Sequence, residues 1–130
     1  MATVPVIFVV EDDPAVRTAI AMLLRQYDYD VRTYDSAESF LEVYEETDSA
    51  CLVSDIRMPG MSGLDLLINL KQQESLLPVV LYSGYADSAV VIEAKKQGVI
   101  AVLAKPVGAN TLHAAVRQAL RSDPAEPVSD

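Results

Sequence analysis

Five short apolar runs alternate with five longer stretches of helical periodicity along this chain. In the longer stretches, apolar side chains recur every three or four residues, which is typical of amphipathic helices. The apolar runs are typical of strands, and they lie at about residues 5–10, 30–34, 50–54, 77–82 and 99–103. Strands that alternate with helices predict an α/β fold in which a parallel sheet carries helices on both faces.

Residues at the ends of the helical stretches support these boundaries. Pro14 stands where the first turn of a helix tolerates proline, and Ser36 has the short hydroxyl side chain of a helix N-cap. Residues 58–63 contain proline, glycine and serine and predict a loop before the third helix. Residues 86–97 predict a helix that Gly98 closes, because glycine readily adopts the left-handed backbone that ends many helices.

The acidic balance of the chain restricts its partners. The 130 residues fit one domain and carry a formal net charge of −9. We therefore expect no direct binding to nucleic acid and no attraction to an anionic membrane surface, since both need basic residues. The first residues lack the basic start of a signal peptide, and no apolar run approaches the roughly 18 residues of a membrane span. These features predict a cytoplasmic protein.

The chain divides into a domain and a short tail. We expect one domain over residues 1–121, and one of its apolar strands contains the single cysteine, Cys51. A lone cysteine excludes an internal disulfide and a cysteine-based zinc cluster, so we expect a buried thiol. Residues 122–130 contain Pro124 and Pro127 without apolar periodicity, and they predict a flexible tail or the start of a linker.

Polar residues that can carry chemistry follow four of the predicted strands. Glu11 and Asp12 follow the first strand, Asp55 the third, Ser83 the fourth and Lys105 the fifth. In open α/β sheets, ligands bind at the edge where the carboxyl ends of the strands lie. If the strand order is 2-1-3-4-5, the first and third strands are neighbours and their three carboxylates converge.

Carboxylates that converge at one edge need a positive charge beside them. They repel one another unless a hard cation neutralises them, and Mg²⁺ is suited to this because it takes oxygen ligands, keeps waters and bridges to phosphate. Next to such a cation, Asp55 can act as a carboxylate nucleophile toward a phosphoryl group. Lys105 then supplies a positive charge for the transferred oxygens, and Ser83 supplies a hydroxyl donor.

Four motifs resemble those of the receiver domain of bacterial two-component response regulators. They are VVEDDP at residues 9–14, VSDIRMPGMSG at residues 53–63, LYSG at residues 81–84 and KP at residues 105–106. The resemblance covers about residues 5–121, and in detail the chain looks like the receivers found ahead of LuxR-type DNA-binding domains. It implies a flavodoxin-like (βα)5 doubly wound parallel sheet with strand order 2-1-3-4-5.

The resemblance implies a set of metal ligands. Asp12 and Asp55 bind Mg²⁺ or Mn²⁺ directly, and the backbone carbonyl of Arg57 supplies another ligand. Glu11 supports the cation through water. Asp13 matches a variable position and is expected to serve as an acid at a helix N-terminus instead of a ligand.

The same resemblance implies a switch controlled by phosphorylation. Asp55 accepts a phosphoryl group from a histidine kinase or a phosphotransfer protein, and Ser83 and Lys105 contact the phosphoryl oxygens. The domain is not a conventional enzyme, although it promotes its own aspartyl phosphorylation and dephosphorylation. The bond between Lys105 and Pro106 is expected to be cis, as it often is in the family.

The residues that relay the phosphorylated state depart from the family's pattern. The family pairs Ser83 with an aromatic residue on the fifth strand, but the matching position here is Val102. Either Tyr82 and Tyr85 take over part of the relay, or Tyr82 packs against a helix and Tyr85 lies exposed in a loop. The fourth helix, fifth strand and fifth helix form the face that the family often uses for dimerisation or output docking, and the resemblance implies a homodimer through this face on phosphorylation.

Three other interpretations compete with a phosphorylated switch. A phosphatase with an aspartyl-phosphate intermediate would need a second acid two residues after Asp55, where the chain has Arg57. A flavodoxin-like cofactor binder would need a phosphate loop after the first strand, where three consecutive acids repel phosphate. A receiver-like docking module that works independently of phosphorylation stays open because of Val102.

Overall fold

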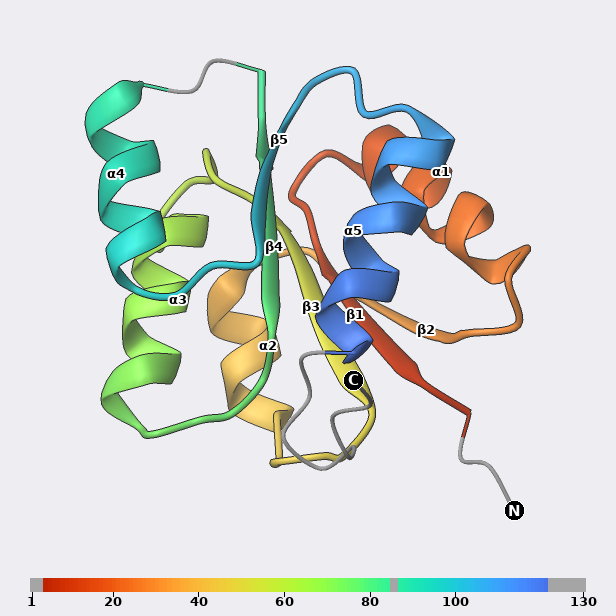
Figure 1. Cartoon of the computed structure of the whole chain (residues 1–130), viewed down its shortest axis with the longest axis horizontal. Coiled ribbons are helices and arrows are strands. Elements are labelled where there is room, and N and C mark those ends of the chain that lie inside the picture. Colours follow the sequence, from red (N-terminus) through yellow and green to blue (C-terminus); the bar gives the residue numbers. More distant parts are fainter. Residues whose placement is uncertain (1–3, 85–86, 122–130) are drawn as a thin grey trace.

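A computed structural model of the chain describes residues 4–84 and 87–121. Within these residues, five strands and five helices alternate along the chain (Figure 1). The strands are β1 (Val6–Val10), β2 (Asp30–Tyr34), β3 (Ala50–Asp55), β4 (Val79–Ser83) and β5 (Ala101–Ala104). The helices are α1 (Pro14–Arg25), α2 (Ala37–Val43), α3 (Gly63–Gln72), α4 (Ser88–Lys96) and α5 (Ala109–Arg121).

The strands of the sheet pair in parallel in the order β2-β1-β3-β4-β5. The predicted α/β fold with strand order 2-1-3-4-5 is therefore confirmed. This order makes β1 and β3 neighbours, with Val10 of β1 opposite Ser54 of β3. The residues that follow these two strands consequently lie next to each other at the carboxyl edge of the sheet.

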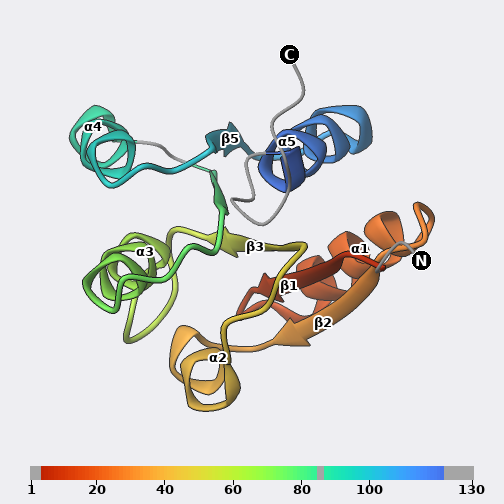
Figure 2. The same ribbon diagram turned by 60° about the horizontal axis from the view of Figure 1, so that its bottom comes forward.

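Helices cover both faces of the sheet. Figure 2 shows α1 and α5 on one face and α2, α3 and α4 on the other. Successive strand residues point to opposite faces, so Phe8 of β1 packs with Phe40 of α2 in one hydrophobic core. Its neighbour Ile7 belongs to the second core, with Leu24 of α1 and Val116 of α5. Packing on both sides stabilises the sheet whose edge carries the polar residues.

Side-chain caps determine where several helices begin. The carboxylate of Asp13 accepts hydrogen bonds at the start of α1, which confirms it as a helix N-terminal acid, and Ser36 caps α2 as predicted. Asp87 caps α4, so that helix begins at Ser88, whereas residue 86 of the predicted helix lies outside the described residues. Gly98 has a φ of +85° and follows the end of α4, as predicted.

Two strands begin two residues later than predicted because the first residues of their apolar runs make other contacts. Pro78 has no N–H to donate, although its carbonyl accepts a hydrogen bond from Leu52 at 2.9 Å, and β4 starts at the next residue. The N–H of Val99 donates to the carbonyl of Ala94 in α4 at 3.1 Å. Val99 therefore completes the end of that helix, and β5 starts at Ala101.

The described residues also bear on the cysteine and on membrane insertion. Cys51 is free and buried in β3, as expected, and burial raises the pKa of its thiol. Over residues 4–84 and 87–121, no helix is long and apolar enough to cross a membrane. The predicted tail at residues 122–130 lies outside the described residues, as does Tyr85.

Candidate functional site

Three carboxylates meet at the carboxyl edge of the sheet. One oxygen each from Glu11, Asp12 and Asp55 lies within 4.8 Å of the others. Glu11 and Asp12 follow β1 and Asp55 ends β3, so the pairing of these two strands brings them together. Glu11 and Asp55 are buried, whereas Asp12 is exposed to solvent. The carboxylates that the sequence places at separate strand ends therefore form one cluster that is open to solvent at Asp12.

Lys105 supplies a positive charge beside these carboxylates. Its Nζ donates a hydrogen bond to Asp55 Oδ2 at 3.0 Å and lies 3.8 Å from Glu11 Oε1. Its backbone N–H donates to the carbonyl of Ser83 at 2.9 Å, and its bond to Pro106 is cis, as predicted. Burial lowers the pKa of Lys105, but the hydrogen bond and charge of Asp55, together with the charges of Glu11 and Asp12, outweigh burial, so the pKa lies above its usual value. The side chain is therefore a cation at physiological pH.

The residues on either side of Asp55 in the chain also bind it. The N–H of Arg57 donates to Asp55 Oδ1 at 3.3 Å, and the hydroxyl of Ser54 donates to the Asp55 carbonyl at 2.9 Å. The loop then returns closely, because the N–H of Gly63 donates to the carbonyl of Ile56 at 2.8 Å. A Cβ at Gly63 would lie 2.2 Å from the Asp55 carbonyl oxygen, so the first residue of α3 has room for no side chain.

Glu11 has a partner that the sequence did not predict. The hydroxyl of Tyr82 donates a hydrogen bond to Glu11 Oε1 at 2.7 Å, and the N–H of Asp13 donates to Glu11 Oε2 at 3.1 Å. Tyr82 is opposite Asp55 in the β3–β4 register, and its ring is buried in the core shared with α1 and α5. Of the two alternatives for Tyr82, packing against a helix is therefore right about its ring, while a part in the relay stays a prediction. The sequence signal for this contact was the position of Tyr82, one residue before Ser83 on the strand that was expected to lie beside the strand of Asp55.

Burial shifts the acidity of both members of this pair. Burial raises the pKa of Glu11 above its usual value, and the hydrogen bonds from Tyr82 and Asp13 offset that effect only in part. Burial, followed by the hydrogen bond to Glu11, raises the pKa of the Tyr82 phenol. The phenol therefore keeps its proton at physiological pH and serves as a hydrogen-bond donor.

The two residues predicted for the switch lie on neighbouring strands. Ser83 is buried at the end of β4, while Val102 is half-buried on β5. Val102 packs against the core beneath α3 and α4, as do Val90 of α4 and Val99. The position where the family has an aromatic residue is thus filled by a small aliphatic side chain. The expected contact of Ser83 with phosphoryl oxygens stays a prediction.

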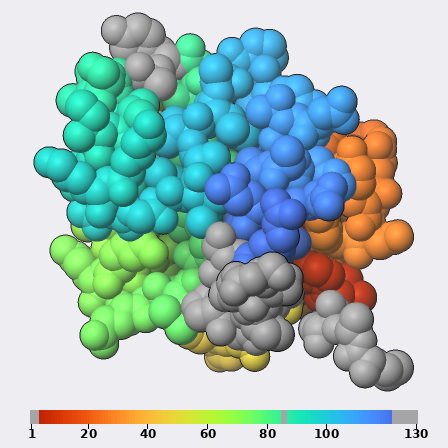
Figure 3. Space-filling view, in the orientation of Figure 1, coloured from red at the N-terminus to blue at the C-terminus, as the bar shows by residue number. Residues whose placement is uncertain are grey.

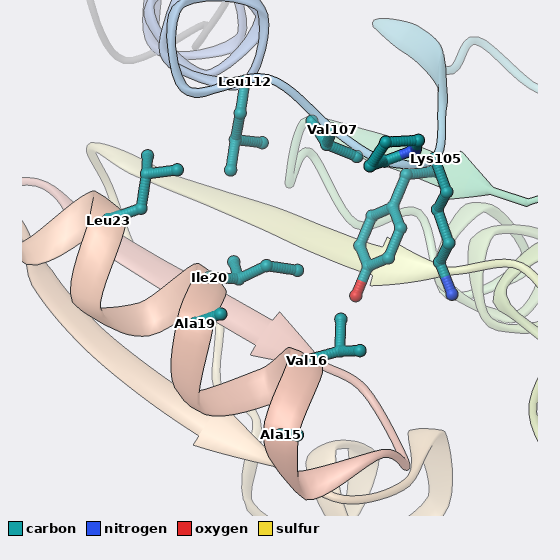
Figure 4. A pocket seen from close by; sticks show the side chains of 10 residues that line it. Ala15, Val16, Ala19, Ile20, Leu23, Lys105, Val107 and Leu112 are labelled. Atoms are coloured by element: carbon teal, nitrogen blue, oxygen red, sulfur yellow. The ribbon is translucent and has the colours of Figure 1, made fainter.

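An apolar pocket adjoins the acidic cluster. Figure 4 shows Val16 and Ile20 of α1 facing Leu112 of α5 across this pocket. Its volume is about 530 Å³, and Tyr82 and Lys105 form part of its wall. Tyr82 therefore borders both the pocket, through its ring, and the acidic cluster, through its hydroxyl.

The donor set of the acidic cluster suits a hard divalent cation. Carboxylate oxygens are the ligands that Mg²⁺ and Mn²⁺ prefer, and the 4.8 Å spacing allows one ion to contact more than one of them. Lys105 is the one cationic side chain that forms a salt bridge to the cluster among the described residues, so the charges of three acids are only partly neutralised. The residues present therefore fit a divalent cation.

The sequence is similar to a known protein family and to two named bacterial regulators. It matches the profile of the response regulator receiver domain over residues 7–117. It is 36% identical over 129 residues to the transcriptional regulatory protein FixJ of Bradyrhizobium diazoefficiens, covering 99% of this chain and 62% of that protein. It is 35% identical over 119 residues to the response regulator protein TodT of Pseudomonas putida, covering 92% of this chain and 52% of that protein. The chain thus spans about half to three-fifths of the length of these relatives.

Solved structures share the fold. The crystal structure of FixJ-N matches with a TM-score of 0.84 and 30% identity, covering 92% of this chain and 95% of that chain. The structure of the response regulator StyR matches with a TM-score of 0.88 and 36% identity, covering 95% of this chain and 62% of that chain. The flavodoxin-like fold that the sequence resemblance implied is thereby confirmed.

Proposed function

Because the chain belongs to the response regulator receiver domain family, whose profile covers residues 7–117, we propose that Asp55 accepts a phosphoryl group. The observation that carries this proposal is the surroundings of Asp55. It is 4% exposed, it lies within 4.8 Å of two other carboxylates, and its Oδ2 is 3.0 Å from the ammonium of Lys105. A carboxylate nucleophile, a positive charge for the transferred oxygens and oxygen ligands for a cation are what such a transfer needs.

In the proposed reaction, an oxygen of Asp55 attacks the phosphorus atom of the donor. The new O–P bond forms while the bond from phosphorus to the leaving group breaks, and the leaving group keeps the electron pair. With a phosphohistidine donor, the departing imidazole is protonated. Lys105, already bound to Asp55 Oδ2, donates to the phosphoryl oxygens, and the hydroxyl of Ser83 is a second donor.

We propose that the acidic cluster holds Mg²⁺ or Mn²⁺. Asp12, Asp55 and the backbone carbonyl of Arg57 are the proposed ligands, and Glu11 supports the ion through water. When bound, the cation neutralises the carboxylates and the phosphoryl oxygens. Asp12 is exposed, so the ion has a route from solvent into the cluster.

The domain is proposed to promote its own phosphorylation and dephosphorylation instead of turning over an external substrate. An aspartyl-phosphate phosphatase would carry a second acid two residues after its nucleophile. Arg57 stands at that position and provides no carboxylic acid to protonate a leaving group. A water molecule that attacks the Asp55 phosphoryl group would release phosphate and restore the carboxylate.

The proposed phosphodonor is a histidine kinase or a phosphotransfer protein in the cytoplasm. Phosphorylation is proposed to change the face formed by α4, β5 and α5, and this face would support a homodimer. Figure 3 shows α4 and α5 on one side of the molecule with the β5 segment between them. We assign residues 1–121 to this domain and residues 122–130 to a tail or linker, and the net charge of −9 disfavours nucleic acid as a direct partner.

A docking module that works independently of phosphorylation is the second candidate. Val102 favours it, because the family's relay from Ser83 uses an aromatic ring at that position. The buried cluster of Glu11 and Asp55 with Lys105 favours the phosphorylated switch, because a docking module has no need of clustered carboxylates.

Phosphorylation by a small donor tests the proposal. The protein is incubated with Mg²⁺ and acetyl phosphate, and its intact mass is measured. We expect one phosphoryl adduct on the wild-type chain and on Asp48→Asn, which changes an exposed acid, and none on Asp55→Asn. The same adduct on Asp55→Asn would overturn the assignment of Asp55.

A further inference from the structure

We infer that Tyr82 is a positioning residue of the acidic site, whose hydroxyl fixes Glu11 for the cation. The inference rests on the proposed function, since it concerns the same cluster. It adds a residue that lies on β4 and belongs to the hydrophobic core, outside the acidic strand ends that define the site. The Tyr82 hydroxyl acts on Glu11, and through Glu11 on the ion.

Both oxygens of Glu11 are held by hydrogen bonds in this structure. Tyr82 donates to Oε1 at 2.7 Å and the N–H of Asp13 donates to Oε2 at 3.1 Å. A short bond from a neutral donor to a carboxylate is stronger than one between two neutral groups. These two bonds fix the plane of the carboxylate, and with it the direction in which its remaining lone pairs face the water through which Glu11 supports the ion.

The donor itself has little freedom to move. The side chain of Tyr82 is fully buried and packs in the same core as Ile20 of α1 and Leu112 of α5. The ammonium of Lys105 lies 5.3 Å from the centre of its ring, which adds a cation–π attraction. A hydroxyl on a ring that is held by packing fixes its acceptor more firmly than a mobile side chain would.

Lys105 cannot replace Tyr82 in this role. Its Nζ is 3.8 Å from Glu11 Oε1 but 3.0 Å from Asp55 Oδ2, so its hydrogen bond goes to Asp55. In the proposed reaction Lys105 also turns to the phosphoryl oxygens. Glu11 is 1% exposed and has little contact with bulk water. When Lys105 turns to the phosphoryl oxygens, the Glu11 carboxylate therefore depends on Tyr82 and the Asp13 N–H for its hydrogen bonds.

The test is the Mg²⁺ affinity of Tyr82→Phe, measured by titration of backbone amide chemical shifts. The ring stays and only the hydroxyl is removed, so the core keeps its packing. We expect the dissociation constant to rise about tenfold, the low end for loss of a residue that orients a metal-binding group. The amide of Asp13, which donates to Glu11 Oε2, should shift in the metal-free variant because the carboxylate is released.

Tyr44→Phe is the matched control. Its hydroxyl also donates to a glutamate, Glu46 Oε1, at 3.0 Å, but Glu46 binds Ser75 and Leu76 ahead of β4, at the opposite edge of the sheet. This variant should bind Mg²⁺ as the wild type does. In a Glu11→Ala background, Tyr82→Phe should cause no further loss of affinity, because Tyr82 acts through Glu11.

The outcomes separate this inference from the proposed function. Equal Mg²⁺ affinity of wild type and Tyr82→Phe, while the wild type is still phosphorylated on Asp55, would overturn the role of Tyr82 alone. An equal loss of affinity with and without Glu11 would show that the hydroxyl acts by a route other than Glu11, which also overturns the inference. A wild-type chain that binds no Mg²⁺ would overturn both the proposed function and this inference.

Discussion

The ammonium of Lys105 donates a hydrogen bond to Asp55 Oδ2 at 3.0 Å, although the two residues are 50 positions apart in the sequence. Lys105 follows β5, an outermost strand of the sheet, whereas Asp55 ends β3, the central strand. The lysine side chain therefore reaches past the end of β4, which lies between them. The same ammonium is 3.8 Å from Glu11. It therefore shares with a bound cation the task of neutralising the cluster.

Lys105→Ala should separate phosphoryl transfer from metal binding. Removal of the ammonium leaves the carboxylates with more negative charge, so Mg²⁺ should bind at least as tightly, by up to about fivefold if the lost repulsion is ~1 kcal/mol. The rate of labelling by acetyl phosphate should fall at least tenfold, because a charged donor to the transferred oxygens is lost (about 1.5–3 kcal/mol). Metal titration and intact-mass kinetics measure the two effects.

Lys96→Ala is the control for that variant, since it removes an exposed lysine at the end of α4. It should match the wild type in both measurements. Weaker Mg²⁺ binding by Lys105→Ala would contradict the view that the ammonium and the cation compete for the same negative charge.

Asp12 and Asp13 are adjacent acids with different expected roles, so one substitution at each position tests the metal site. Asp12→Asn should weaken Mg²⁺ binding by about tenfold or more and slow labelling by acetyl phosphate, because a charged ligand becomes a neutral one. Asp13→Asn removes the same charge but keeps a side chain that can cap α1. It should therefore change Mg²⁺ affinity much less. Equal losses in the two variants would indicate a general effect of charge and would remove Asp12 as a ligand.

The convergence of Glu11, Asp12 and Asp55 could be predicted from the sequence because it depends on topology alone. In a parallel α/β sheet, residues that follow the strands meet at one edge, whatever the details of side-chain packing. The alternation of apolar runs with helical stretches was enough to find those strand ends, whereas the strand order that makes β1 and β3 neighbours was implied by the resemblance to the receiver family. The same reasoning placed Ser83 and Lys105 at that edge, and the structure has both at the ends of their strands.

The contact between Tyr82 and Glu11 could not be predicted in this way. It depends on the length and direction of a phenol side chain that extends from β4 toward the residue after β1, across the intervening β3. The close approach of Gly63 to Asp55 likewise depends on how the loop after β3 folds back. Sequence periodicity reports which face a residue occupies, but it does not report how near two loops come.

Gly63→Ala should displace the backbone at Asp55. A Cβ at Gly63 would lie 2.2 Å from the Asp55 carbonyl oxygen, and that backbone atom cannot move aside as a flexible side chain can. We expect a loss of about 1–3 kcal/mol in the free energy of unfolding, as for other overpacked sites. Labelling by acetyl phosphate should also slow. Urea unfolding and intact mass check both.

Gly108→Ala is the matched control for Gly63→Ala. A Cβ at Gly108 would lie 3.7 Å from Thr111 Oγ1, which is an ordinary contact. Its stability and labelling should stay near those of the wild type. A Gly63→Ala variant as stable as Gly108→Ala would show that the start of α3 can shift without cost.

Hydrogen bonds of Glu46 connect the segment before β3 to the segment before β4. Its pKa predicts how the stability of the fold depends on pH. Burial alone would raise the pKa of Glu46, but hydrogen bonds from the Ser75 hydroxyl, the Leu76 N–H and the Tyr44 hydroxyl outweigh burial and lower it. A carboxyl whose pKa is lowered in the folded state stabilises the fold at pH values above its pKa in the unfolded state, 4.5. That contribution is lost as the pH falls through the pKa that Glu46 has in the folded state.

Glu46→Gln should therefore lower the free energy of unfolding at pH 7 by about 1 kcal/mol or less, since the side chain is exposed and its charge is screened. The gap between variant and wild type should narrow as the pH falls below 4.5. Glu45→Gln, a neighbouring exposed acid, should show no such gap. Urea titrations at several pH values give the measurement, and a gap that stays constant with pH would contradict the assigned hydrogen bonds.

Val102 makes the response of the α4–β5–α5 face a test between the two candidate functions. A phosphorylated switch should show amide shift changes in α4 and β5 when beryllofluoride and Mg²⁺ are added, even though an aliphatic side chain fills the position of the family's aromatic ring. Asp55→Asn should show none of these changes, because it lacks the carboxylate that the mimic binds. A docking module that works independently of phosphorylation would give changes confined to the residues around Asp55. Changes that reach Val90 and Val102 would instead establish that the relay operates through the core that these two side chains share.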